Sequence, residues 1–447
     1  MNASNESETV APADPKEIKP LAAVKVLARE RDLRYLIGVR IGSQGGDGLF
    51  EVGLASLFFF SPERASTTAG VALAFAVMLL PFTLIGPWAG VLLDLWQRRS
   101  VLIWANIIRA GLVLIIAGLV ATGSYGPLLY VLALMCLSLN RFIIAALSAS
   151  LPRVTPRHLL LVANSIVPTM GGVATLAGAA IAVVVRVIAP GSRLGDGMIL
   201  IISALAVTAA AFVASRIPVS RLGPDRTSQL SQVGAQLMTL LRGMVQGAKY
   251  LVARRTPAAG LAIMTVHRFI YGITFVAAIL ISRNLLADPA DADAGLAIFG
   301  AVLGATGVGY TLSAFITPFM QRFISPHQWI SCCLALAAAS QLLITVTITL
   351  WSVVTCAVLL GLAAQGAKIA VDTIVQRDTA DSHRGRAFSF FDVLFNAAFV
   401  AAAAVSIVLL PDTGASIPVF AGLAVTYFVT SVVYLRSPTV PRPVPSQ

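Results

Sequence analysis

The stretch RYLIGVRIGSQGGDGLFEVGLASLFFF (residues 34–60) decides the fold, because it is a long apolar run interrupted by regularly spaced polar side chains. Four polar residues stand at positions i, i+4, i+7 and i+11 and therefore share one face of an α-helix: Arg40, Gln44, Asp47 and Glu51. A charged side chain in the hydrocarbon of a bilayer costs roughly 2.5 to 3.5 kcal/mol. The run therefore predicts a membrane-spanning helix whose polar face is turned toward protein or toward a water-filled pathway.

The composition of the whole chain is that of a multi-pass membrane protein. Hydrophobic residues make up 57% of the 447 residues and charged residues only 12%, which leaves too little polar surface for a soluble domain of this length. The net charge of +12 comes from Lys and Arg in short segments between apolar runs, where they set orientation, so we expect no nucleic-acid partner. The four cysteines lie inside apolar runs and indicate buried thiols, with no disulfide framework and no metal site.

A window of about 20 residues finds twelve apolar runs along the chain. They cover residues 34–60, 67–93, 99–121, 127–151, 160–188, 197–216, 258–286, 294–322, 328–349, 351–376, 387–410 and 416–435. A short repeat, LPRVTP (151–156) and VQRDTA (375–380), stands at the end of the fourth run in each set of six. The sequence therefore predicts an all-α membrane protein of twelve transmembrane helices in two six-helix bundles.

The expected organisation has five parts. An N-terminal tail (1–33) precedes the first bundle (34–216), and a linker (217–257) leads to the second bundle (258–435) and a C-terminal tail (436–447). Within the linker, apolar residues recur at helical spacing opposite Arg242, Lys249, Arg254 and Arg255, which is typical of an amphipathic helix lying on an anionic membrane surface. The alternative is a solvated linker helix without lipid contact.

Most Lys and Arg residues outside the runs fall in alternate connecting segments and in the two tails. Cytoplasmic loops carry such an excess of cations, so this alternation predicts that both termini are cytoplasmic. The expected location is the cell (cytoplasmic) membrane.

The segment GVLLDLWQRRSVL (90–102) resembles the loop signature GxxxDxxxRRxxL of the major facilitator superfamily. Four further segments resemble its enterobactin-exporter and macrolide-efflux branch: residues 40–54, 80–94, 151–165 and 375–396. This resemblance implies the major facilitator fold and a secondary transporter that exports a bulky amphipathic small molecule, such as a drug, macrolide or siderophore, in exchange for protons by alternating access.

The loop signature also has a physical interpretation. Gly90 permits close helix approach, and Arg98 and Arg99 are placed to bridge Asp94 and the carbonyl ends of neighbouring helices. We therefore expect these four residues to form a latch that holds one conformation. The alternative is that the two arginines only determine topology.

Asp47 and Glu51 are the leading candidates for proton coupling. Two carboxylates one helical turn apart repel each other, which favours proton uptake by one of them, and Arg40 or Arg141 would tune that carboxylate. In the alternative interpretation Asp47 caps a kink at Gly45, Gly46 and Gly48, and Glu51 pairs with an arginine.

Further polar residues inside the apolar runs complete the expected cavity. Arg141 stands where the superfamily carries a helix-four arginine linked to proton coupling, although a structural ion pair is the alternative. Lys368 and Asp372, at i, i+4, are spaced to satisfy each other, and the lone His267 fits a hydrogen-bonded cavity wall better than a metal ligand. The full set of additional candidates is Arg109, Asn140, Arg141, His267, Arg268, Tyr271, Gln365, Lys368, Asp372, Asp392 and Asn396.

The sequence carries neither a phosphate-binding loop GxxxxGK[ST] nor a nucleophile elbow, so we expect no enzyme activity, no catalytic residues and no cofactor. The expected partners are a small-molecule substrate, protons and membrane lipids, and the expected state is a monomer. Two alternatives stay open: a lipid or lipid-linked glycan flippase of the same fold, and a non-transporting membrane scaffold or sensor.

Overall fold

The computed structural model describes residues 27, 29–59, 67–84, 88, 93, 95–124, 126–156, 159–189, 193–223, 230–379 and 381–440. Within these residues the chain forms thirteen α-helices and no strand. The N-terminal half contains α2 (Arg31–Phe59), α3 (Thr68–Leu84), α5 (Arg98–Ala121), α6 (Pro127–Val154), α7 (Leu160–Ile188) and α8 (Arg193–Ser215). After α9 (Leu230–Arg254), the C-terminal half contains α10 (Thr256–Asn284), α11 (Ala292–Met320), α12 (Pro326–Val346), α13 (Leu350–Asp378), α14 (Asp381–Leu409) and α15 (Ile417–Leu435).

The helices begin where the sequence provides start signals. Capping boxes open α12, with Ser325 and Gln328, and α13, with Thr349 and Ser352. Ten helices, α5 to α8 and α10 to α15, are long and apolar enough to cross a membrane. Of the other two in the halves, α2 carries the polar face predicted above, and α3 is described over 17 residues. The predicted all-α membrane fold is therefore confirmed.

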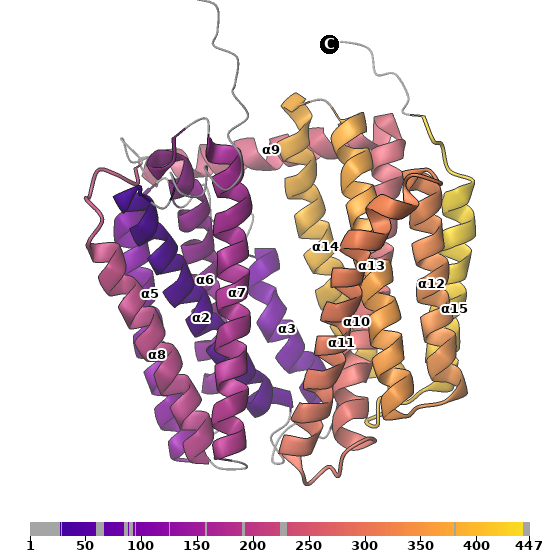
Figure 1. Cartoon of the computed structure of the whole chain (residues 1–447), viewed down its shortest axis with the longest axis horizontal. Helices are drawn as coiled ribbons and strands as arrows, with labels where there is room; N and C mark the ends of the chain where they lie inside the picture. The colour runs from indigo at the N-terminus through magenta and orange to yellow at the C-terminus, as the bar shows by residue number, and fades with distance from the viewer. Residues whose placement is uncertain are drawn as a thin grey trace, which may run out of the picture.

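The two halves stand side by side, and α9 lies across one end of the molecule (Figure 1). In the N-terminal half, α2 packs against α7 and α8, and α5 packs against α6 and α8. In the C-terminal half, α13 packs against α11 and α12, and α12 also packs against α15. The main packing between the halves is that of α3 against α10 and α14. We call the two ends of the molecule the α9 end and the far end.

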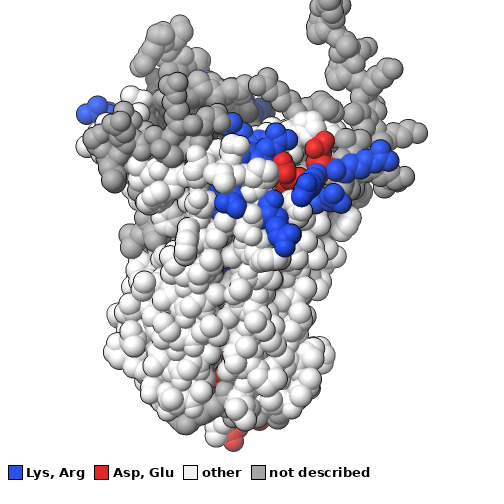
Figure 2. Space-filling view, turned by 90° about the vertical axis from the view of Figure 1, so that its left-hand side faces the viewer, with Lys and Arg blue, Asp and Glu red and all other residues white. Residues whose placement is uncertain are grey.

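The surface is divided into a charged end and an apolar band. On the face of the N-terminal half, Lys and Arg gather at the α9 end above a broad area without charge (Figure 2). Large apolar side chains point outward along the helices; Leu176, Val187 and Trp351 are 71%, 74% and 78% exposed. Apolar surface of this extent requires lipid around it.

Glycines set the contact between α2 and α7. A Cβ atom on Gly48 would overlap the carbonyl oxygen of Thr175, and a Cβ on Gly178 would overlap the carbonyl oxygen of Gly45. The two helix backbones therefore touch at a crossing that only glycine permits. α2 runs without a break from Arg31 to Phe59, so its glycines serve this contact and do not interrupt the helix.

Candidate functional site

The most deeply buried charges form an ion pair between α2 and α5. Arg109 is fully buried and Asp47 is 3% exposed, and Arg109 Nη2 pairs with Asp47 Oδ1. The guanidinium also lies 5.7 Å from the centre of the Phe50 ring. Asp47 is thus turned into the N-terminal half, where its charge is matched by a cation from another helix.

Glu51 lies one turn farther along α2 and is only partly buried. It interacts electrostatically with Asp47, Arg109 and Arg141, and the side chains of Asn140 and Arg141 also interact with Asp47. These residues bring α2, α5 and α6 together in one polar cluster. Within this cluster Asp47 forms an ion pair with Arg109, whereas the side chain of Glu51 is partly exposed at the protein surface.

The other half of the predicted stripe turns toward α7. Arg40 is 6% exposed, and its Nε donates to Gln44 Oε1 at 2.8 Å. A Cβ on Gly171 of α7 would overlap both side chains, so the arginine lies directly against that helix. The four residues share one helix face as predicted, and Arg40 and Asp47 on that face are buried against protein.

His267 is a buried wall residue of the C-terminal half. It is 3% exposed, and its Nδ1 lies 3.0 Å from the hydroxyl of the fully buried Tyr427. Among the described residues no group of three or more His, Cys, Asp or Glu is placed to hold a metal ion. The geometry agrees with the expectation of a hydrogen-bonded histidine.

The polar residues of α13 and α14 form a second cluster. Lys368 Nζ lies 2.6 Å from Asp372 Oδ2, as the i, i+4 spacing predicts. Asp392 interacts electrostatically with both of them, and Asn396 Nδ2 donates to the Asp392 carbonyl at 2.7 Å. Lys368 also lines a small cavity together with Gln365.

Arg268 is held by aromatic rings instead of a carboxylate. Its guanidinium carbon lies 3.6 Å from the centre of the Phe399 ring, 4.5 Å from that of Phe395 and 5.7 Å from that of Tyr271. Stacking on aromatic faces is favourable for a guanidinium and leaves its N–H edge available.

Gly90 and Asp94 lie outside the described residues, so the latch is seen only through its arginines. Arg98 Nη1 donates to the carbonyl oxygens of Ala149, at 2.9 Å, and Leu222, at 3.2 Å. Arg99 Nη2 donates to the carbonyl of Ser215 at 2.8 Å, at the end of α8. These contacts join the start of α5 to the end of α6, to the end of α8 and to the chain just beyond α8. The conformational role of the four residues stays a prediction.

An ion cluster at the far end joins the two halves and was not found by sequence reasoning. Arg186 of α7 pairs with Asp196 of α8 in the same half, and its Nε lies 2.6 Å from Asp293 Oδ1 of α11 in the other half. Ser56 Oγ donates to Asp196 at 3.3 Å. We call Arg186, Asp196 and Asp293 the far-end clasp. The sequence shows that these three charged residues lie near the ends of helices. It does not show that they pair, because their pairing depends on how the helices are arranged in the fold.

Two more contacts fasten the same end. Thr68 of α3 donates from its backbone N–H and its hydroxyl to Asp412 Oδ1, at 2.7 and 3.1 Å. Arg283 Nη1 donates to the carbonyl of Phe59 at 3.0 Å. The contacts of Thr68 with Asp412, of Arg283 with Phe59 and of Arg186 with Asp293 thus join the two halves at this end.

The apolar core also joins the two halves at the far end and not at the α9 end of the N-terminal half. One continuous cluster runs from Phe58 and Val71 of the N-terminal half to Ile273 and Val276 of the C-terminal half. Toward the α9 end, the N-terminal half has a separate core of its own. A hollow of ≈ 270 Å³ lies there between α2 and α7, beside Arg34 and Met170.

Comparisons with known proteins agree with this architecture. The model of the Major Facilitator Superfamily matches residues 260–447. The "Uncharacterized MFS-type transporter Rv0037c" of Mycobacterium tuberculosis is 35% identical over 394 residues, covering 87% of this chain and 87% of that protein. Its Mycobacterium bovis counterpart, Mb0038c, matches to the same extent.

Solved structures share the fold at low sequence identity. The crystal structure of a bacterial homologue of the iron transporter ferroportin, in an inward-facing state, matches with a TM-score of 0.64 and 13% identity over 91% of this chain and 99% of that chain. The nucleoside transporter NupG matches with a TM-score of 0.61 and 12% identity over 90% and 97%. With a relative so similar over nearly its full length, this multi-pass membrane protein belongs to the major facilitator superfamily of transporters.

Proposed function

We propose that this protein is a proton-coupled exporter of an amphipathic small molecule that works by alternating access in the cytoplasmic membrane. The observation that carries the proposal is the asymmetry of the two ends: the halves are fastened at the far end by polar contacts and a shared apolar core. This arrangement is what a carrier needs in its inward-facing state. The cations at the α9 end support a cytoplasmic position for that end and for both termini.

The proposed export activity is tested by growth of an expressing strain against a panel of antibiotics and siderophores, with and without an uncoupler. We expect resistance to at least one amphipathic compound, and we expect the uncoupler to abolish it. Unchanged growth across the panel would oppose export, and resistance that survives the uncoupler would oppose proton coupling. The enterobactin-exporter and macrolide-efflux resemblance selects the compounds to try first.

Glu51 is the proposed proton carrier. It is a partly exposed carboxylate beside Arg141, while Asp47 is already paired with the fully buried Arg109. Glu51→Gln is expected to lower uncoupler-sensitive efflux at least about tenfold, which corresponds to about 1.4 kcal/mol, with normal amounts of folded protein. The measurement is efflux of the compound identified in the growth panel from energised cells.

The matched control for Glu51 is Glu30→Gln, which removes the same charge just before α2 begins and is expected to leave efflux unchanged. If Glu51→Gln transports as well as the natural chain, another group carries the proton.

The far-end clasp is expected to hold the inward-facing state. A partly buried ion pair contributes about 1 kcal/mol, so Asp293→Asn is expected to raise the outward-open population about fivefold. The measurement is the rate at which an impermeant maleimide, added outside intact cells, labels Gln365→Cys in a background without the four native cysteines.

Asp288→Asn is the control for the clasp, because Asp288 is an exposed carboxylate in the segment just before α11, the helix that carries Asp293. Its labelling rate is expected to equal that of the natural chain. Equal rates for both variants would mean that the clasp does not bias the conformational equilibrium.

A further inference from the structure

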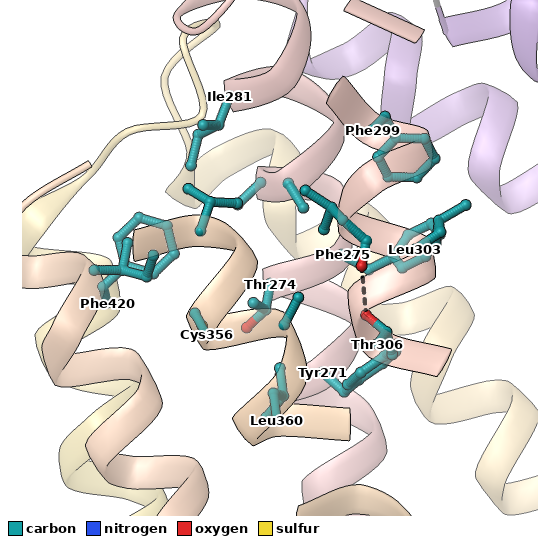
Figure 3. A pocket seen from close by; sticks show the side chains of 16 residues that line it. Tyr271, Thr274, Phe275, Ile281, Phe299, Leu303, Thr306, Cys356, Leu360 and Phe420 are labelled. Carbon is teal, nitrogen blue, oxygen red and sulfur yellow. Dashed lines mark hydrogen bonds between the residues drawn. The ribbon is translucent and has the colours of Figure 1, made fainter. Parts of the chain in front are cut away.

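Two neighbouring cavities lie inside the C-terminal half and share the side chain of Tyr271. One is lined by α10, α11, α13 and α14 and contains Arg268, Tyr310, Gln365 and Lys368. The other lies among α10, α11, α12, α13 and α15 and is lined almost entirely by apolar side chains (Figure 3). Tyr271 belongs to the lining of both cavities; we call the cavity with Arg268 the polar part and the other the apolar part.

The polar part is rich in donors and has one unmatched cation. Its described lining residues supply a guanidinium, an ammonium, an imidazole, an amide and tyrosine hydroxyls, and no carboxylate. Lys368 is neutralised by Asp372. Among the described residues Arg268 has no ion-pair partner, and its Nε is buried without a hydrogen-bond partner. Arg268 as a whole is partly buried, and a guanidinium that only aromatic rings support is a site for an anion such as a phosphate or carboxylate.

The apolar part offers almost no polar group to a ligand. The labelled side chains of Phe275, Phe299, Leu360 and Phe420 surround it in Figure 3. The hydroxyls of Thr274 and Thr306 donate to carbonyl oxygens of their own helices, at 3.1 and 2.9 Å. The walls are therefore matched to hydrocarbon.

The volume of the apolar part limits which hydrocarbon group of a ligand it can hold. The cavity measures ≈ 50 Å³. An apolar cavity of about 150 Å³ accepts benzene. The smaller space fits the end of an alkyl chain better than a ring system, and a chain in it would begin beside Tyr271, next to the polar part.

We propose that this combined site binds an anionic amphiphile with one narrow alkyl chain, its head group on Arg268 and its chain end in the apolar cavity. Arg268 lies near the middle of α10, at the depth where carriers of this architecture hold their substrates. The proposal rests on the proposed function and narrows its substrate class from any amphipathic molecule to anionic single-chain amphiphiles.

The test is binding to the purified full chain in phosphatidylcholine nanodiscs. The probes are n-alkyl phosphates of increasing chain length, the matching n-alkanols and inorganic phosphate, measured by calorimetry. We expect affinity for the alkyl phosphates to rise about fourfold for each added methylene until the cavity is full. Inorganic phosphate is expected to bind at least about tenfold more weakly than the best alkyl phosphate.

Two variants separate the two parts of the site. Arg268→Gln is expected to weaken alkyl phosphate binding at least about tenfold while leaving alkanol binding unchanged. Ala278→Leu, which fills the apolar part, is expected to stop the gain in affinity at a shorter chain. The controls are Arg322→Gln, which removes an exposed cation, and Ala262→Leu, which adds the same volume on an exposed face of α10.

Equal affinity for phosphates and alkanols, or a chain-length dependence unchanged by Ala278→Leu, would overturn the proposal. Tight binding of inorganic phosphate alone would also overturn it, since the apolar part would then have no role. Because binding is measured without a gradient, absence of efflux with this binding intact overturns only the exporter proposal. Uncoupler-sensitive efflux without this binding overturns only the proposed substrate class.

Discussion

Asp47→Asn is expected to destabilise the folded protein by about 3 to 5 kcal/mol, because it leaves the guanidinium of Arg109 fully buried without its counter-charge. Arginine keeps its proton in proteins and so has no way to become neutral. Arg109→Met is expected to cost less, since Asp47 is able to take up a proton and also interacts with Arg141. Thermal unfolding of the purified variants, followed by tryptophan fluorescence and size-exclusion chromatography, measures the difference.

The same helix provides the control for this pair. Asp32→Asn removes a carboxylate of α2 whose partner, Arg221, is 56% exposed at the side chain, so the expected loss is at most about 1 kcal/mol. If Asp47→Asn unfolds at the same temperature as Asp32→Asn, the buried pair does not stabilise the N-terminal half.

Gly48→Ala is expected to separate α2 from α7 and to destabilise the protein by about 1 to 3 kcal/mol or more. The added methyl group would overlap the backbone carbonyl oxygen of Thr175, which has no rotamer to change. Relief requires one helix to move, and that movement would also disturb the ion pair at the neighbouring Asp47. The unfolding temperature and the yield of monodisperse protein measure the effect.

Gly172→Ala on α7 is the matched control, since a Cβ there meets no other atom within 4 Å. Alanine in an open helical position is favoured over glycine by about 0.5 to 1 kcal/mol, so this variant should be as stable as the natural chain or slightly more stable. Equal unfolding temperatures for the two alanine variants would mean that the crossing tolerates a side chain.

Local features of this protein were predictable from its sequence. The helices follow from apolar runs of membrane-spanning length, and α9 follows from helical spacing of its apolar residues. Lys368 and Asp372 pair within one helix, so their spacing alone was sufficient. The face shared by Arg40, Gln44, Asp47 and Glu51 also follows from helical geometry.

Partners on different helices were not predictable in the same way. Five cations (Arg40, Arg109, Arg141, Arg268 and Lys368) and four carboxylates lie well inside the apolar runs, away from their ends. Nothing in their order along the chain selects Arg109 for Asp47. The far-end clasp joins residues of three helices in two halves. The apolar cavity was missed for another reason: its lining residues are the same kinds of residue that fill any helical core.

The sharing of Arg186 between two carboxylates has a consequence for the rate of opening. If the halves part at the far end, as the proposed alternating-access cycle requires, Arg186 loses Asp293 but keeps Asp196, which belongs to the same half. Arg186 therefore always has a carboxylate partner inside the protein. Only Asp293, whose side chain is already 29% exposed, has to become fully hydrated. A clasp of this design slows opening less than an isolated buried pair would, and it closes again onto an arginine that is held in position.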